Sequence, residues 1–240
     1  MKTNYHTHTK RCKHAFGEDE EYVKSAIKGG YSILGFADHT PWPYLKKNSS
    51  SIRMETNQLP EYVSSIIFLK ERFENQIDIK IGLECEFIER YTTWLSEVKE
   101  QYKLDYLLFG NHYPFGERGP LYTSKDHRLY THRAIKAMQT GIYDCIAHPE
   151  ILYRGSEISS VDKEYFRELS RAAKYLNIIM EYNTCYKFKR DLWEIVAQED
   201  CKVIIGLDAH KPETLEDDSI YTMALANMKS VGIVPITNLK

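Results

Sequence analysis

The chain is rich in side chains that bind metal ions, and most of them follow short apolar runs. It contains nine histidines in 240 residues. Seven of these lie at or just beyond the C-terminal end of an apolar segment, as does Asp208, and Glu84 lies inside another such segment, IKIGLECEF. The seven are His6, His8, His14, His39, His112, His148 and His210. Imidazole and carboxylate ligands suit Zn, Mn or Fe, and thiolate-rich copper or iron–sulfur sites are not indicated.

These nine side chains exceed what one metal ion needs. A mononuclear site takes three or four protein ligands, so nine candidates predict two or three metal ions. Closely spaced cations repel each other, and a bridging carboxylate offsets that repulsion where neutral imidazole does not. Glu84 and Asp208 are the acids in position to bridge. Such a centre lowers the pKa of a bound water and stabilises both attacking and leaving oxygens, which suits phosphate esters.

Three other potential ligands are interpreted differently. His127 and His132 lie in SKDHRLYTHRAIKAM, a predicted helix start, and do not share one helical face. We expect both at the surface, without a role in the site. Cys12 precedes His14 by two residues, and we expect it to be a packed or exposed thiol and not a ligand.

The apolar runs predict the elements that position these residues. Several runs, such as YSILGFA, IIMEY and KVIIGL, are almost continuously apolar, as in parallel strands covered on both faces. The predicted strands are Lys2–His8, Tyr31–Ala37, Ile77–Phe87, Leu104–Gly110, Tyr143–Ala147, Ile178–Tyr182 and Lys202–Leu207. His6 and His8 alternate along the first of these, so both side chains leave on one face.

Amphipathic segments follow the strands and predict helices. We expect them at about Glu18–Lys28, Asn57–Asn75, Trp94–Tyr102, Asp126–Thr140, Val161–Leu176, Asp191–Gln198 and Leu215–Val231. Seven strand–helix units favour an α/β fold of the TIM-barrel type over an open sheet, which normally carries a Gly-rich phosphate loop that is missing here. In a barrel, the C-terminal strand ends converge on one rim and bring the nine candidate ligands together.

Composition limits the functional classes. The net charge of −2 offers no bulk attraction for nucleic acid, and no long uncharged apolar run predicts a membrane span. The first residues, MKTNYHTHTKRCKHAF, lack the apolar core of a secretory signal. Five scattered cysteines without a CxxC pair are typical of reduced thiols. We therefore expect one cytoplasmic domain over residues 1–240, with its oligomeric state open.

The order of the motifs resembles the PHP family, named for polymerases and histidinol phosphatases. The motifs HTH, CKHA, DH, GLE, NH, AHP and GLDAH run from His6 to His210. The chain is too short for a polymerase, so the resemblance is to the stand-alone histidinol-phosphatase branch, as it is in LGFADHTPWPY, IKIGLECEF and EYNTCYKFKRDLW. The resemblance implies a distorted seven-stranded (β/α)7 barrel.

The same resemblance implies a ligand set for three divalent ions, whether Zn, Mn or Fe. The first position is implied at His6, His8, Glu84 and Asp208. The second is implied at Glu84, His112 and His148, and the third at His14, His39 and His210. All nine residues are present, which argues against a degenerate, non-catalytic copy.

The reaction implied is hydrolysis of L-histidinol phosphate to L-histidinol and phosphate, a late step of histidine biosynthesis, by in-line attack of a metal-bridging hydroxide. The candidate catalytic residues are Asp38, His39, Asp208 and His210. Asp38 is a candidate proton relay or orienting partner, and we favour the orienting role.

Cationic donors usually hold a phosphate dianion on its open side. Arg154 follows His148 in AHPEILYRGS, and Arg190 follows the sixth predicted strand in KFKR. Both are candidate phosphate-binding residues, with Lys187 or Lys189 as substitutes for Arg190. Glu181 and Asn183 end the same strand, and the sequence leaves open whether they reach the substrate and ligands or only hydrogen-bond within the rim.

Two alternatives remain at this point. A phosphodiesterase or exonuclease of the same family should carry a basic, aromatic-interleaved track for a single strand, and KFKR at 187–190 is a short candidate. A metal-dependent regulator would bind a phosphorylated metabolite without turnover. The expected partner is a small-molecule phosphate ester, with neither nucleic acid nor membrane.

Overall fold

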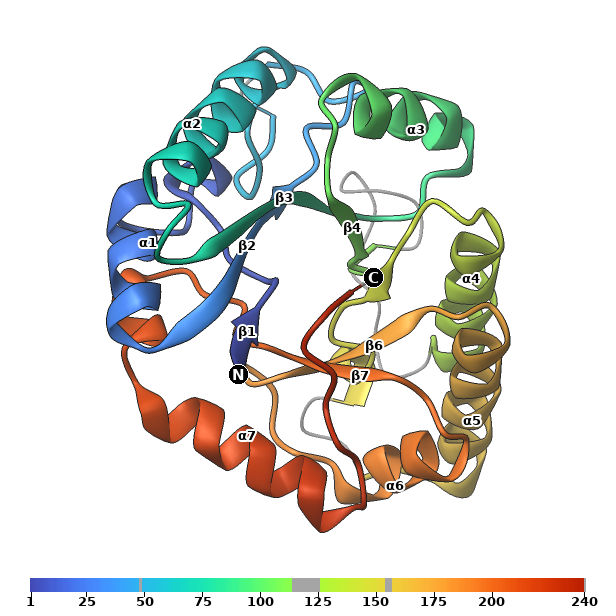
Figure 1. The fold of residues 1–240 in the computed structure, drawn as a ribbon. Coiled ribbons are helices and arrows are strands. Elements are labelled where there is room, and N and C mark those ends of the chain that lie inside the picture. The colour runs from blue at the N-terminus through green and yellow to red at the C-terminus, as the bar shows by residue number, and fades with distance from the viewer. Residues whose placement is uncertain (48, 114–125, 154–156, 240) are drawn as a thin grey trace.

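Each predicted strand is present in the computed structural model, and neighbouring strands pair in parallel in the order of the sequence. The structure describes residues 1–47, 49–113, 126–153 and 157–239. The strands are β1 (Lys2–Asn4), β2 (Tyr31–His39), β3 (Asp78–Cys85), β4 (Tyr106–Phe109), β5 (Cys145–Ile146), β6 (Ile179–Asn183) and β7 (Val203–Gly206). The sheet curls into a distorted barrel, which confirms the predicted fold class (Figure 1).

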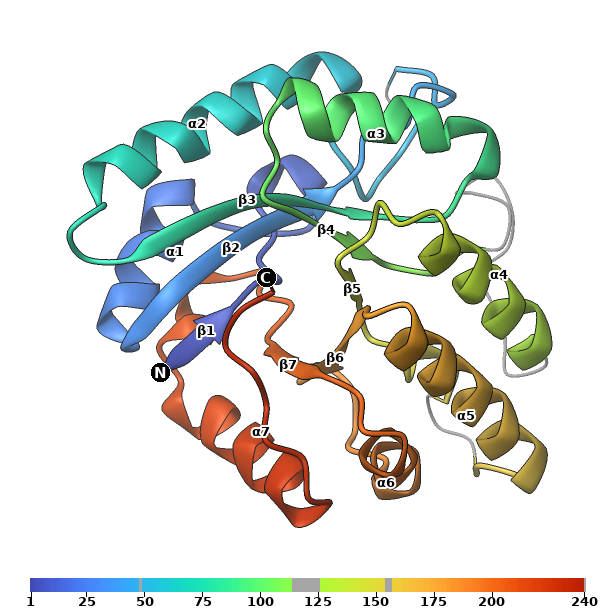
Figure 2. The same ribbon diagram turned by 45° about the vertical axis from the view of Figure 1, so that its right-hand side comes forward.

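Helices lie around the outside of this sheet (Figures 1 and 2). Each predicted helix is present within a few residues of its expected bounds. They are α1 (Asp19–Lys28), α2 (Leu59–Arg72), α3 (Thr92–Gln101), α4 (His127–Gln139), α5 (Ser160–Tyr175), α6 (Arg190–Gln198) and α7 (Asp218–Ser230). Local sequence sets several ends: Ser159 and Asp162 form a capping box at α5, and Gly30 takes a φ of 76° after α1. Within the described residues, none of the helices is long and apolar enough to cross a membrane.

The barrel has a seam where its two edge strands, β1 and β7, meet. β1 ends at Asn4, so the prediction that it continues to His8 is wrong. The Asn4 side chain takes over the pairing: its Oδ1 accepts from the Leu207 amide at 2.9 Å, and its Nδ2 donates to the His6 carbonyl at 3.0 Å. Just beyond, Thr7 forms a parallel bridge with Ala209. The chain is therefore held across the seam next to the residues that follow β1 and β7.

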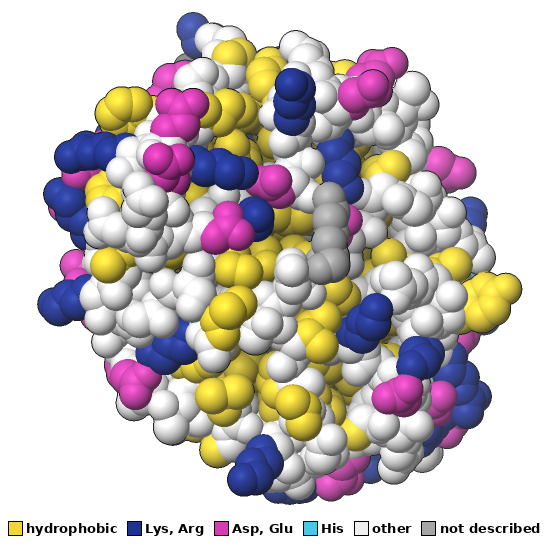
Figure 3. All heavy atoms as spheres, viewed as in Figure 1, with side chains coloured by type: hydrophobic (Ala, Val, Ile, Leu, Met, Phe, Trp, Pro, Cys, Tyr) yellow, Lys and Arg dark blue, Asp and Glu magenta, His cyan; other side chains and the backbone are white. Residues whose placement is uncertain are grey.

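The inside of the barrel is filled and covered at one end by the C-terminal segment. Tyr5, Tyr106 and Leu108 pack in the interior with Leu239 and Ile236. The last segment runs across the barrel in Figure 1, and the face that carries both chain ends shows hydrophobic side chains across its middle in Figure 3. The opposite end, at the carboxyl termini of the strands, holds the candidate ligands.

Candidate metal centre

The structure brings the nine predicted ligands together at the carboxyl ends of the strands. They come from the residues after β1, from the ends of β2 and β3, and from the segments after β4, β5 and β7. A cleft of about 220 Å³ opens over them and is lined by His8, His14, His39, Ile52, Glu84, His112, Tyr113, Tyr186, Asp208 and His210. Residues from both ends of the sequence and from its middle thus share one small space.

Glu84 lies at the centre of this cluster and is only 1% exposed. Its Oε1 is 2.7 Å from His148 Nε2 and 3.4 Å from His112 Nε2. Its Oε2 is 3.0 Å from His39 Nδ1 and 3.6 Å from the Nε2 atoms of both His6 and His8. The two oxygens therefore face different groups of imidazoles, the arrangement required of a carboxylate that bridges two cations.

A glycine directly after the next strand, β4, makes room for this carboxylate. A Cβ at Gly110 would lie 2.1 Å from Glu84 Oε1, so any larger residue would displace the side chain. The same device recurs at Gly206, where a Cβ would lie 1.8 Å from Glu181 Oε1. Two buried glutamates thus reach inward only because glycine stands beside each of them.

Asp208 is the second carboxylate of the ligand cluster. Its Oδ1 is 3.2 Å from His8 Nε2 and 3.5 Å from His6 Nε2. The backbone at Asp208 is left-handed, with a φ of 50°, as it is at His148 with a φ of 32°. Non-glycine residues in this region are uncommon, cost about 1–3 kcal/mol each and concentrate at functional sites. Both lie in the predicted ligand set.

Hydrogen bonds fix most of the rings with Nε2 inward. An Nδ1 that faces a carbonyl or carboxylate must carry the hydrogen, which leaves the Nε2 lone pair for a metal ion. The acceptors are Glu181 for His6 at 2.9 Å, Asp38 for His8 at 3.4 Å, the Cys12 carbonyl for His14 at 2.7 Å and the Asp208 carbonyl for His210 at 2.8 Å. Glu86 faces His112 Nδ1 at 3.5 Å without forming a hydrogen bond. His39 differs, since its Nδ1 faces Glu84.

The inward nitrogens make a donor set that fits metal ions. His6 Nε2 lies 3.1 Å from His8 Nε2, and His14 Nε2 lies 2.8 Å from His210 Nε2. Two ring nitrogens at this distance need a proton or a cation between them. Triads of potential ligand atoms lie within 4.8 Å of one another at His6–Glu84–His148, His6–His8–Asp208, His8–His39–Glu84, His39–Glu86–His112 and His8–Cys12–His210. The chain therefore holds several overlapping sites for N- and O-binding metals.

Electrostatics favour cations in this cluster. Burial opposes a charge on His6, but Glu181, Asp208 and Glu84 outweigh it and raise the pKa of His6 well above its usual value. Burial likewise opposes ionisation of Glu84, yet His112, His39 and His6 hold its pKa well below the usual range. Burial opposes ionisation of Asp208 too, but His6 and His8 hold its pKa well below the usual range. Glu84 and Asp208 are thus both ionised and attract positive charge, whether protons on imidazole or metal ions.

The imidazoles of His39 and His210 are uncharged at neutral pH. Burial lowers the pKa of His39 to about 3. At His210 burial and the charge on His8 together lower the pKa to about 4. Imidazole binds a metal only when it is unprotonated, so both rings are ready to ligate at neutral pH.

A model of the PHP domain matches residues 4–186, most of the chain. The chain belongs to the PHP family. It is 27% identical over 225 residues to a probable histidinol-phosphatase of Deinococcus radiodurans, covering 86% of this chain and 85% of that protein. Its fold matches a histidinol phosphate phosphatase of Lactococcus lactis, solved with Zn, L-histidinol and phosphate, with a TM-score of 0.80 at 20% identity, covering 98% and 95% of the two chains. A putative histidinol phosphatase of Listeria monocytogenes matches with a TM-score of 0.76 at 16% identity, covering 92% and 99%.

The structure shows what the side chains of Glu181 and Asn183 contact, which the sequence left open. Glu181 accepts from His6, from the His148 amide at 3.0 Å and from Asn183 Nδ2 at 3.1 Å, and Asn183 also donates to Asp208 at 3.3 Å. Asp38 contacts His8 and accepts from the hydroxyl of Thr9. The two acids, Glu181 and Asp38, and the amide of Asn183 therefore each contact predicted ligands.

The two arginine predictions fare differently. Arg154 lies outside the described residues and stays a prediction. Arg190 begins α6, where its guanidinium donates to the Ser230 carbonyl at 3.0 Å and to the Ser230 hydroxyl at 2.9 Å and lies 3.5 Å from Glu194. These contacts are with the C-terminal end of α7 and with α6 itself. The structure does not bring Arg190 to the cleft.

The sequence reasoning missed a buried ion pair beneath the cleft. Glu86 is bound by Arg53 at 2.8 Å and by the indole of Trp42 at 2.6 Å, and it faces His112 Nδ1. Arg53 is fully buried and also donates to the Thr40 carbonyl at 2.8 Å. The alternation in ECEF places Glu86 on the same side as Glu84, a signal that was available in the sequence.

The expectations for the remaining histidines, His127 and His132, and for Cys12 have different outcomes. His132 is exposed, as predicted. His127 is only 6% exposed, so the surface prediction is wrong: it hydrogen-bonds Asp162 at the start of α5 and stacks on Tyr153 at 4.6 Å between centroids. Cys12 is a packed thiol, as expected, but it lies against the cluster. Burial opposes its ionisation, yet hydrogen bonds with His14 and His8 lower the pKa of Cys12.

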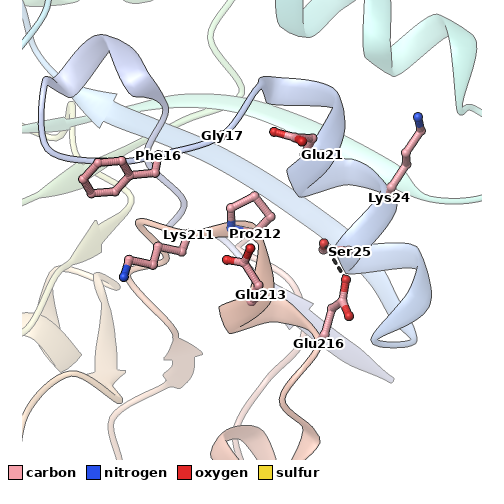
Figure 4. A pocket seen from close by; sticks show the side chains of 9 residues that line it. All are labelled: Phe16, Gly17, Glu21, Lys24, Ser25, Lys211, Pro212, Glu213 and Glu216. Atoms are coloured by element: carbon pink, nitrogen blue, oxygen red, sulfur yellow. Dashed lines mark hydrogen bonds between the residues drawn. The ribbon is translucent and has the colours of Figure 1, made fainter.

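A second, larger groove of about 580 Å³ lies beside the cleft, between α1 and the turn η5 (Pro212–Leu215). Figure 4 shows Phe16 and Lys211 at one end of it and the bond from Ser25 to Glu216 at the other. Lys28 also pairs with Glu216. The groove has mixed, partly paired charges, and among the described residues no cluster of potential ligand atoms lies in it, so its size does not make it the reactive site.

Proposed function

We propose that this PHP protein is a metal-dependent phosphomonoesterase that hydrolyses L-histidinol phosphate to L-histidinol and phosphate. The observation that carries the proposal is Glu84, a buried carboxylate whose two oxygens face separate groups of imidazoles. The names of the Deinococcus and Lactococcus proteins support the substrate. The reaction needs a centre that holds more than one cation, and this carboxylate would supply its bridge.

The chain's own residues would hold and orient that centre. His6, His8, Glu84 and Asp208 would hold one ion, His112 and His148 would share Glu84 with a second, and His14, His39 and His210 would hold a third. Bound metal ions supply Lewis-acid stabilisation of phosphate oxygens and an activated water at neutral pH. Outside the ligands, Glu181 and Asp38 would keep the Nε2 atoms of His6 and His8 free of hydrogen by accepting from Nδ1 on the opposite side of each ring.

The cleft fits a small ester. Its volume of about 220 Å³ is below the roughly 300–1,000 Å³ usual for drug-sized ligands, and two aromatic side chains, Tyr113 and Tyr186, line it with the histidines. We infer that these rings flank the imidazole of the substrate while its phosphate lies over Glu84 and Asp208. Arg154, six residues after His148 in the sequence, remains the proposed cationic donor to phosphate.

The test compares substrates on metal-loaded protein. Phosphate release from L-histidinol phosphate is measured beside release from other small phosphomonoesters and cleavage of a short DNA oligomer. The proposal expects kcat/KM for L-histidinol phosphate to exceed that for the other monoesters by at least about tenfold, a difference of about 1.4 kcal/mol in transition-state binding. Equal rates on all monoesters would refute the substrate, and preferential cleavage of DNA would point to a phosphodiesterase instead.

A further inference from the structure

Cys12 is placed among the metal ligands by a rigid turn. It ends the turn η1 (Lys10–Cys12), in which the Thr9 side chain accepts from the Arg11 amide. Arg11 is buried and fixed by two acids: it donates to Asp19 at 2.8 Å and twice to Glu61 at 2.8 Å. The turn is therefore held by ion pairs behind it, and the position of Cys12 follows from them.

The thiol faces inward and meets two of the imidazoles. Cys12 is 0% exposed. Its Sγ, a ring nitrogen of His8 and a ring nitrogen of His210 all lie within 4.8 Å of one another. Its carbonyl accepts from His14 Nδ1 at 2.7 Å, so the same residue also orients a third ring. We propose that Cys12 is itself a ligand at the third metal position and makes it a mixed nitrogen–sulfur site that prefers Zn or Fe to Mn.

Charge gives a reason for such a ligand. His14, His39 and His210 are neutral when they bind metal, so a third position built from them alone adds no negative charge beside the first two cations. A thiolate supplies one. On binding, the Cys12 S–H bond breaks, its proton passes to solvent, and a sulfur lone pair forms the bond to the metal. Thiolate also selects Zn or Fe over the harder Mn, which prefers oxygen ligands.

Another buried cysteine provides a matched control. Cys145 is equally buried but lies among apolar residues inside the barrel, with Tyr106, Leu108 and Ile179. Burial raises its pKa well above the usual value. Removing this thiol changes the packing of the barrel without changing the ligand cluster.

The inference rests on the proposal that the cleft binds metal ions, and spectroscopy separates it from the proposed reaction. The wild type, Cys12→Ser and Cys145→Ala are loaded with Co²⁺ and examined for a sulfur-to-cobalt charge-transfer band in the near ultraviolet. We expect the band in the wild type and in Cys145→Ala, and its loss in Cys12→Ser, whose most weakly held ion should bind at least about tenfold less tightly. A band of equal strength in Cys12→Ser, or none in the wild type, overturns the proposal.

X-ray absorption of the Zn-loaded wild type gives a second reading that requires no variant. A zinc–sulfur distance of about 2.3 Å supports Cys12 as a ligand, and a shell of nitrogen and oxygen alone overturns it. Turnover is recorded on the same samples. Hydrolysis of L-histidinol phosphate without sulfur ligation would refute this inference and leave the proposed function standing. Sulfur ligation without hydrolysis would support it and refute that function.

Discussion

Replacing Glu181 by Gln tests whether the residues outside the ligand set control the metals. The carboxylate of Glu181 is 0% exposed and accepts hydrogen bonds from three donors: His6 Nδ1 at 2.9 Å, the His148 amide at 3.0 Å and Asn183 Nδ2 at 3.1 Å. The amide of Gln has the same shape, but its NH₂ group must then face one of these donors. At least one buried group loses its partner.

The structure sets the size of the effect. A buried polar group without a partner costs about 1–3 kcal/mol of folding free energy. Loss of the partner that orients a ligand typically lowers metal affinity by about 10–100-fold, or about 1.4–2.8 kcal/mol. Because Glu181 contacts both His6 and His148, we expect the larger end of that range for Glu181→Gln and a similar fall in kcat/KM.

Chelator competition measures the metal affinity, and denaturant unfolding of the metal-free protein measures stability. Glu194→Gln is the matched control, since Glu194 is a half-exposed glutamate on α6, remote from the ligand cluster, that pairs with Arg190. The reasoning is refuted if Glu181→Gln folds, binds its metals within twofold of the wild type and retains wild-type kcat/KM.

Three further perturbations follow from the same geometry. Glu84→Gln should keep the fold, lose metal from the positions that share this carboxylate and lower kcat by at least about 10²-fold, and metal analysis beside phosphate release checks it. Gly206→Ala should push Glu181 away and cost about 1–3 kcal/mol of unfolding free energy, and an unchanged thermal midpoint would count against the close approach. Metal affinity should rise with pH between about 6 and 8, because His6 and His8 have raised pKa values and protons on these rings compete with metal at the lower pH. Chelator competition at several pH values measures this slope, and an affinity that falls with pH would contradict it.

The sequence predicted the fold because local patterns carried it. The apolar runs of parallel strands are visible without tertiary information, and the ends of such strands must meet on one rim. The gathering of His6, Glu84 and Asp208 follows from that topology alone. The exact strand lengths do not, because pairing across the seam depends on one side chain, Asn4, which ends β1 before His6.

The errors lie where a side chain's partner is far away in sequence. The surface prediction for His127 failed because Asp162 and Tyr153, on other elements, bury it. Arg190 follows a strand end closely, yet as the first residue of α6 it bonds to Ser230 of α7. A short distance along the chain places a residue near the rim, but the helix that begins there decides which way its side chain leaves.

Metal ions bound at the seam between β1 and β7 would also hold the two edges of the barrel together. His6 and His8 follow β1 at one edge of the barrel, and Asp208 follows β7 at the other. An ion bound between them would cross-link these two edges. A cross-link that closes a very long loop restricts the unfolded chain more than one that closes a short loop. During synthesis, this cross-link between His6 and Asp208 can form only after β7 has been made, whereas Glu84 and His148 can come together earlier. Metal binding at the seam would therefore require that the last strand, β7, has already packed beside β1. Removal of the ions should destabilise the N-terminal edge of the barrel first.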